Sequence, residues 1–264
     1  MSDTIDAEDL LRLLQYEPGL VLQDCDTFLD IGEKLNETGK SRASAMVKSD
    51  QLSKWLVDDV FSSTLLVNGH SDLEAAEGPS PLSFIDAQII NIFRQNRQAL
   101  VITYFCSLHR EVDHHSQGSP TAKMMVSLVG QLLTQMIERE LEVDISFLTK
   151  TNLRSIERIE LEILCVLFRE LTAQLPPKTV LFCVLDELSM YETSSLGRET
   201  DAIVRRLTRL VVKSEEVILK VLITCRGRSL DFHKYFDNQD ILDLQEDIEA
   251  DDIAMWRIKN FAAK

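Results

Sequence analysis

The chain has 264 residues, 45% of them hydrophobic, which is enough to bury one sizeable core. Its 43 acidic and 28 basic residues leave a formal net charge of -15. This charge argues against nucleic acid and anionic membrane surfaces as partners because both carry the same sign. We therefore expect proteins or small molecules as partners.

The cysteines and the amino terminus indicate a reducing compartment. Four of the five cysteines lie in apolar segments, where a reduced thiol behaves as a small hydrophobic side chain. The first 15 residues are acidic and amphipathic, which is not typical of a secretory signal. No apolar run approaches the roughly 18 residues of a membrane span. We expect a cytoplasmic location.

Residues 1–60 predict a helical amino-terminal segment. Apolar residues recur at helical spacing in three stretches, 6–15, 26–37 and 41–60, with polar or glycine-containing breaks between them. The pattern changes after residue 60. We therefore expect two parts, a helical segment over 1–60 and an α/β domain over 61–264.

Five short apolar runs then predict strands at 63–68, 99–105, 179–185, 217–224 and 240–244. Most of these runs are continuously apolar, which is typical of parallel strands covered on both faces. Apolar stripes at helical spacing predict helices between them at 81–96, 121–137, 161–171 and 201–212. The order β, α, β, α, α, β, α, β, β, α predicts an open, mostly parallel sheet with helices on both sides.

The third predicted strand ends on two carboxylates, Asp186 and Glu187. Ligands of such sheets bind outside the carboxyl ends of the strands. An apolar strand followed by Asp-Glu is also the second nucleotide-site motif of P-loop ATPases, in which the aspartate holds magnesium and the glutamate polarises the attacking water. The alternative is a strand that ends in solvated acids, which is common.

The fourth predicted strand brings cations to the same edge of the sheet. It ends at Thr224, and Arg226 and Arg228 follow. In a nucleotide site these arginines could sense the terminal phosphate. The alternative is a pair of surface arginines that offset the neighbouring carboxylates.

The loop after the first strand departs from a working phosphate loop. That loop needs Gly, four residues and Gly-Lys-Ser/Thr between a strand and a helix, because backbone amides and one lysine neutralise the phosphates. Here Gly69, Gly78 and Ser80 are the candidate phosphate-contacting residues, but residues 69–80 contain no lysine or arginine and three acids. Losing the charged contact alone costs roughly 1.5 to 3 kcal/mol. We expect weak binding of ATP.

Two other motifs predict no site. A Gly-Lys-Ser sequence at 39–41 follows no apolar strand, so it does not fit a phosphate loop. The cluster of Cys106, His109, His114 and His115 lacks the spacing of convergent metal ligands, which favours a solvated loop.

Six stretches of the chain carry a family resemblance. They are KWLVDDVFSSTLLVNGHSDLEAAEGPSPLSFIDAQI, VITYFCSLHREVD, MMVSLVGQLLTQM, VLFCVLDELSMYE, KVLITCRGRS and DIEADDIAMW. In this order they resemble the NACHT-like nucleotide-binding domain of fungal STAND proteins, which are relatives of signalling ATPases. The resemblance covers roughly residues 50 to 260.

The resemblance implies a three-layer, P-loop NTPase-like fold with a parallel sheet of about five strands in the order 5-1-4-3-2. It implies that Asp186 and Glu187 are the catalytic pair, with Asp186 holding magnesium through water if nucleotide binds. The other matched positions are Gly69 in the phosphate loop, Thr224 and Arg226 at the sensor position, and Asp252 to Trp256 after the last strand.

These observations lead us to expect a degenerate NACHT-like module that acts as an intracellular signalling or interaction domain, with weak or no nucleotide hydrolysis and no certain cofactor. Its partners would be proteins, with self-association one option. Two alternatives stay open. One is an active ATPase that binds Mg-ATP or ADP and uses Asp186, Glu187 and Arg226 with an unconventional phosphate loop. The other is a ligand-free accessory protein whose acids pair with Arg226 or Arg228.

Overall fold

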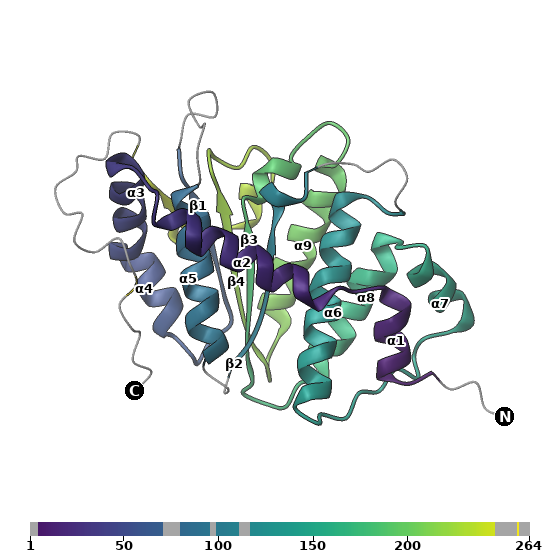
Figure 1. Ribbon diagram of the computed structural model, residues 1–264. Helices are drawn as coiled ribbons and strands as arrows, with labels where there is room; N and C mark the ends of the chain where they lie inside the picture. The colour runs from purple at the N-terminus through teal and green to yellow at the C-terminus, as the bar shows by residue number, and fades with distance from the viewer. Residues whose placement is uncertain (1–4, 71–79, 96–98, 111–116, 246–257, 259–264) are drawn as a thin grey trace.

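The structure is a computed structural model that describes residues 5–70, 80–95, 99–110, 117–245 and 258. It is an α/β fold in which helices cover both faces of a single sheet (Figure 1). Four predicted features lie outside the described residues: Gly78, the pair His114 and His115, the segment from Asp252 to Trp256, and the helix expected after the last strand.

The sheet has five strands in the order β2-β3-β4-β1-β5, and every neighbouring pair is parallel. This confirms the expected order. The strands are β1 (Ser63–Asn68), β2 (Ala99–Phe105), β3 (Val180–Asp186), β4 (Ile218–Cys225) and β5 (Ile241–Asp243). Strands β2, β3 and β4 are almost completely buried, and so are the last four residues of β1, which agrees with their mostly apolar sequences.

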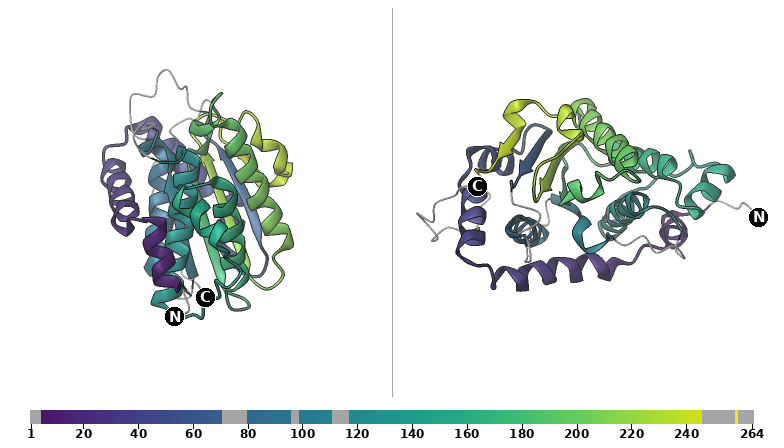
Figure 2. Two further views of the ribbon diagram at one scale, coloured as in Figure 1. Left: turned by 90° about the vertical axis from the view of Figure 1, so that its right-hand side faces the viewer. Right: turned by 90° about the horizontal axis from the view of Figure 1, so that it is seen from above.

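Nine α-helices surround the sheet in the described part of the chain. They are α1 (Ala7–Leu14), α2 (Pro18–Gly32), α3 (Glu37–Lys48), α4 (Asp50–Val57), α5 (Pro81–Gln95), α6 (Pro120–Glu138), α7 (Lys150–Glu157), α8 (Leu161–Ala173) and α9 (Gly197–Lys213). One core cluster joins one face of the sheet to α1 and to α6 through α9, and the other joins the opposite face to α2 through α5. In the view from above, α2 runs along the outside of the molecule, beyond α5 (Figure 2).

Alternating residues of each strand supply these two cores. On β3, Leu181, Cys183 and Leu185 belong to the first cluster, whereas Phe182 and Val184 belong to the second. Successive strand residues point to opposite faces, so a fully apolar strand contributes to both layers at once.

The helical boundaries differ from the predicted ones in three places. The helix expected over 26–37 is α2 at Pro18–Gly32, and residues 33–36 separate it from α3. The stretch 41–60 was expected to be one helix, but the structure breaks it at Ser49, whose hydroxyl caps α4 by accepting from the Leu52 amide at 3.2 Å. Helix α7 was not predicted, because its stretch is mostly polar and contains one buried residue, Ile156. A Thr149 capping box fixes its start, so local hydrogen bonds compensate for the weak apolar signal.

Side chains of α6 close the open edge of β2. The Gln131 amide accepts from the Thr103 N–H at 2.9 Å and donates to the Thr103 carbonyl at 2.6 Å. Gln135 makes the same two bonds to Val101, at 3.0 and 2.9 Å, and Arg139 donates to the Ala99 carbonyl. A step of four residues along α6 thus matches a step of two residues along β2. The side chains of α6 therefore bond to the edge of β2 where a sixth strand would otherwise pair.

Candidate functional site

The parallel register brings the predicted polar residues together at the carboxyl ends of the inner strands. Leu185 pairs with Ile223, so the next residue of each strand places Asp186 beside Thr224. Asn68 pairs with Cys225, which places Gly69 beside Arg226. Five of the predicted residues, Asp186, Glu187, Gly69, Thr224 and Arg226, therefore meet at one edge, as the strand-end argument predicts.

Asp186 is completely buried, and two hydroxyl groups lie within hydrogen-bond distance of its carboxyl oxygens. The Ser83 hydroxyl of α5 lies 2.9 and 2.8 Å from its two carboxylate oxygens. The Thr224 hydroxyl lies 3.0 Å from Oδ1. The carboxyl group is thus enclosed by neighbours from α5 and β4 and is not directed into solvent.

A second buried acid, Asp86 of α5, shares this environment. The Thr224 hydroxyl lies 2.8 Å from Asp86 Oδ2 and also accepts the Glu187 N–H at 3.2 Å. A hydroxyl has one proton, so Thr224 can donate to only one of the two carboxyls that it contacts. The other contact is a hydrogen bond only if that carboxyl carries a proton. The geometry therefore indicates that Asp86 and Asp186 hold a proton between them.

The electrostatics of this acid pair agree with the hydrogen-bond count. Burial raises the pKa of Asp86 to about 7, hydrogen bonds with Thr224 and Asp186 offset part of this increase, and the charge of Glu187 adds to it. Burial, followed by the charges of Glu187 and Asp86, raises the pKa of Asp186 well above its ordinary range. Two carboxyls so close together in a dry environment cannot both ionise at neutral pH.

Glu187 follows Asp186 and turns away from it. Its backbone is left-handed, with φ of 50°, and its side chain is completely buried. Arg226 Nε donates to Glu187 Oε1 at 2.6 Å, and the Arg226 side chain is only 13% exposed. Glu187 Oε2 and Asp86 Oδ1 are buried without a hydrogen-bond partner among the residues that the structure describes. The cluster is therefore closed by one buried ion pair but retains two unsatisfied oxygens.

The backbone after β1 is also occupied. The Gly69 N–H donates to the Cys225 carbonyl at 2.8 Å, and the His70 N–H donates to the Gly227 carbonyl at 2.9 Å. A Cβ at Gly69 would lie 2.6 Å from the Arg226 carbonyl oxygen, so this close approach requires glycine. These two amides extend the pairing of β1 with β4, and neither is free to contact a phosphate.

Ser80 lies just before α5 and is buried, and its hydroxyl accepts from the Ser83 N–H at 3.4 Å. Ser83, and not Ser80, contacts Asp186. The Gly-Lys-Ser sequence at 39–41 lies within α3, so it forms no loop between a strand and a helix. His109 binds Asp24 at 2.8 Å. Within the described ranges no group of three or more His, Cys, Asp or Glu side chains could hold a metal ion.

This arrangement does not fit a magnesium ion at Asp186. Magnesium needs charged or polar oxygens with several waters around it. Here hydroxyl groups occupy the Asp186 oxygens, and the pKa of the carboxyl is raised by burial and by the charges of Glu187 and Asp86. No step of a reaction is therefore assigned to a metal at this site.

Sequence reasoning missed Ser83 and Asp86. Both lie on α5, three residues apart. Both are polar and completely buried, whereas most of their neighbours on the helix are apolar. A pair of polar residues at helical spacing within a buried helix, next to strands that end in acids, is the signal that could have found them. Neither residue belongs to a recognised short motif.

Taken together, the fold and the site define a parallel α/β protein with a closed cluster of acids at the carboxyl ends of its central strands. The family model described as Nephrocystin 3, N-terminal, matches residues 42–226. The match spans α3 to the end of β4 and more than half of the chain, so the protein belongs to this family. No curated protein matches the chain. None of the helices described is long and apolar enough to cross a membrane.

Proposed function

We propose that the chain is a degenerate, NACHT-like relative of the P-loop NTPases, of the kind found in STAND proteins. In this proposal it acts as a cytoplasmic signalling or protein-interaction domain that binds nucleotide weakly or not at all. The observation that carries the proposal is the closed acid cluster, in which Asp186 is bonded to Ser83 and Thr224 and Glu187 is bonded to Arg226.

The strand order and the position of the acids support descent from a nucleotide-binding scaffold. A parallel sheet offers its ligand site at the carboxyl ends of the strands, which is where Asp186, Thr224 and Arg226 lie. The occupied amides of Gly69 and His70 oppose a phosphate at the same edge. All five cysteines are free and buried, which agrees with a reducing, cytoplasmic location.

A thermal-shift series with ATP, ADP and GTP, with and without magnesium, tests this proposal. A ligand at 100 times its Kd stabilises the folded state by about 2.7 kcal/mol, which raises Tm by several degrees in a chain of this size. We expect no nucleotide to raise Tm measurably at about 1 mM, so any Kd lies above about 10 μM. Micromolar binding of Mg-ATP in a calorimetric titration would contradict the proposal.

A second candidate function is ATP hydrolysis that uses Asp186, Glu187 and Arg226. The unpaired Oε2 of Glu187 favours it, because a free carboxylate oxygen is what a water-orienting residue needs. This candidate predicts phosphate release that Glu187→Gln abolishes and that Gln95→Leu, at an exposed position on α5, leaves in place. Equal phosphate release by the wild type and Glu187→Gln would eliminate it.

A further inference from the structure

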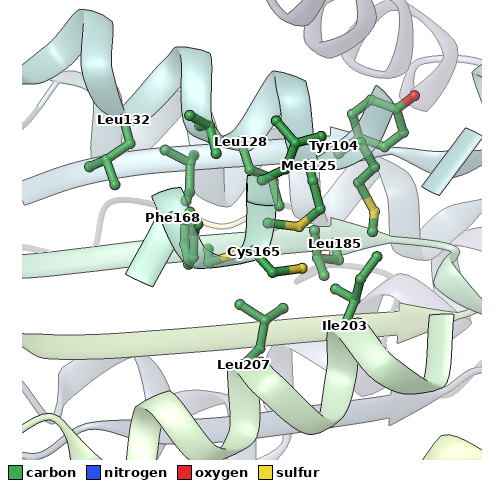
Figure 3. Packing of buried hydrophobic residues seen from close by; sticks show 14 of the residues in the cluster. Tyr104, Met125, Leu128, Leu132, Cys165, Phe168, Leu185, Ile203 and Leu207 are labelled. Carbon is green, nitrogen blue, oxygen red and sulfur yellow. The ribbon is translucent and has the colours of Figure 1, made fainter. Parts of the chain in front are cut away.

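A small apolar pocket opens between α8 and α9, on the face of the sheet that α6 covers. Its volume is about 190 Å³, and its apolar wall includes Met125, Cys165, Phe168, Ile203 and Leu207. Figure 3 shows these side chains within the packed core, with Ile203 and Leu207 of α9 directed toward Met125 of α6 and Cys165 of α8. Binding sites for drug-sized ligands measure about 300 to 1,000 Å³. The pocket is therefore closer in size to one large side chain than to a cofactor.

Cations surround this pocket although the chain carries a net charge of -15. Arg169, Arg206, Arg209 and Lys213 line it. Arg169 pairs with Glu170, and Arg206 with Glu162. Arg209 and Lys213 are exposed, four residues apart on α9, and make no ion pair with any residue that the structure describes. Arg206 Nη1 is buried and has no hydrogen-bond partner within the described part of the chain. The rim favours an occupant that carries acids beside an apolar anchor.

A segment with this chemistry lies elsewhere on the same molecule. Between α4 and β1, the anchor loop Val57–Phe61 reads Val-Asp-Asp-Val-Phe. Phe61 is 69% exposed, Val57 67% and Val60 64%, which makes the loop a concentrated exposed apolar site. Asp59 is exposed and makes no ion pair with the described residues.

Hydrogen bonds from a buried lysine and to the side chain of Asp58 hold the anchor loop in place. Lys220 of β4 is buried, and its ammonium group donates to the Asp58 carbonyl at 2.7 Å and to the Phe61 carbonyl at 3.5 Å. Asp58 Oδ1 accepts from the Val60 and Phe61 amides at 3.1 and 3.2 Å. A loop fixed in this way loses little conformational freedom on binding, so its exposed side chains are preorganised for contact.

We propose that the anchor loop of one copy docks into the α8–α9 pocket of a second copy. Phe61 fills the pocket, and Asp59 lies against Arg209 and Lys213. The charges are complementary at this contact although two copies repel each other overall, and repulsion beyond about 8 Å is screened at physiological salt. This inference rests on the proposed interaction role and names its partner, and it requires no nucleotide.

The test is the mass of the full chain in solution without nucleotide, measured by sedimentation and light scattering at about 100 μM, where a complex with a Kd near 1 μM is almost fully formed. We expect the wild type to exceed the monomer mass. Phe61→Ala and the double variant Arg209→Glu/Lys213→Glu should each weaken association about 30-fold or more, as expected for a central anchor. High salt should weaken the wild-type complex.

Mixing the two variants isolates the contact. One supplies an intact pocket and the other an intact anchor loop, so the mixture should form more complex than either variant forms alone at the same total concentration. Leu230→Ala, also at an exposed apolar residue, and Lys150→Glu/Arg154→Glu, with the same charge change on α7, should associate as the wild type does.

A monomeric wild type at this concentration would overturn the inference, and so would a mixture that stays monomeric while the wild type associates. Either result leaves the nucleotide titrations unaffected, so this proposal and the closed-site proposal can fail separately.

Discussion

Two regions of the sheet present polar groups that need hydrogen-bond partners, and the two regions differ in how these partners are supplied. At the β2 edge, Gln131 and Gln135 are neutral, and each amide forms one donor and one acceptor bond to the same strand residue. At the carboxyl ends of β3 and β4, three acids are buried with one arginine, and two carboxylate oxygens lack partners among the described residues. The backbone N–H and C=O groups of Val101 and Thr103 at the edge are all bonded, whereas the acid cluster retains buried charge at an electrostatic cost. Costly polar groups of this kind are typical of sites with a functional origin.

The largest expected effect comes from removing the only cation bonded to Glu187 among the described residues. Arg226→Met leaves a buried carboxylate without its partner, so we expect the free energy of unfolding to fall by about 3 to 5 kcal/mol in urea titrations. The double variant Glu187→Gln/Arg226→Met should recover most of this loss because no charge stays buried. A loss below about 1 kcal/mol in the single variant would show that water screens the pair as it does a surface pair.

The next effect concerns the β2 edge. Gln131→Leu/Gln135→Leu leaves the N–H and C=O groups of Val101 and Thr103 without these partners, and water can reach only part of them. We expect a loss of about 2 to 4 kcal/mol, together with aggregation that increases with concentration, because an unpaired strand edge is exposed. Gln95→Leu, at an exposed position near the end of α5, is the matched control and should do neither. An unchanged urea midpoint in the double variant would show that the side-chain bonds add nothing to stability.

The third effect is the smallest when it is expressed as the change in unfolding free energy per pH unit. It distinguishes the acid cluster, which titrates, from the β2 edge, which does not. The folded pKa of Asp86, about 7, lies above the unfolded value of about 3.9. At a pH between these two values, folding takes up a proton. The contribution of Asp86 to stability is therefore highest below about pH 4, falls as the pH rises to about 7, and is constant above that. The slope for one proton is at most about 1.4 kcal/mol per pH unit.

Asp86→Asn should flatten this slope and raise stability at pH 7 relative to the wild type, as measured by urea unfolding from pH 4 to 8. The Gln131→Leu/Gln135→Leu variant should keep the wild-type slope, because amides do not titrate. The acids whose pKa is lowered by hydrogen bonds, such as Asp144 and Asp201, act in a different window, near and below pH 4. An identical slope in Asp86→Asn and the wild type would rule out the shared proton.

The sequence by itself determined the strands and their parallel pairing, whereas the order of the strands was an expectation from the family resemblance. Strands 63–68 and 99–105 have the predicted bounds, and the other three differ by one residue at the ends, because continuous apolar runs have few alternatives to a buried parallel strand. Parallel strands end at one edge, so the meeting of Asp186, Glu187, Thr224 and Arg226 also followed from their order in the chain.

Only the tertiary structure decided what these residues do to one another. Asp86 lies 100 residues before Asp186, and nothing in the sequence around either indicates that a shared hydroxyl, Thr224, brings them into one proton-sharing group. The same holds for Gln131 and Gln135, which as residues of α6 resemble surface amides but bond to an edge strand. Periodicity specifies which face of an element is buried, whereas the pairing of polar groups depends on distances between elements that meet only after folding.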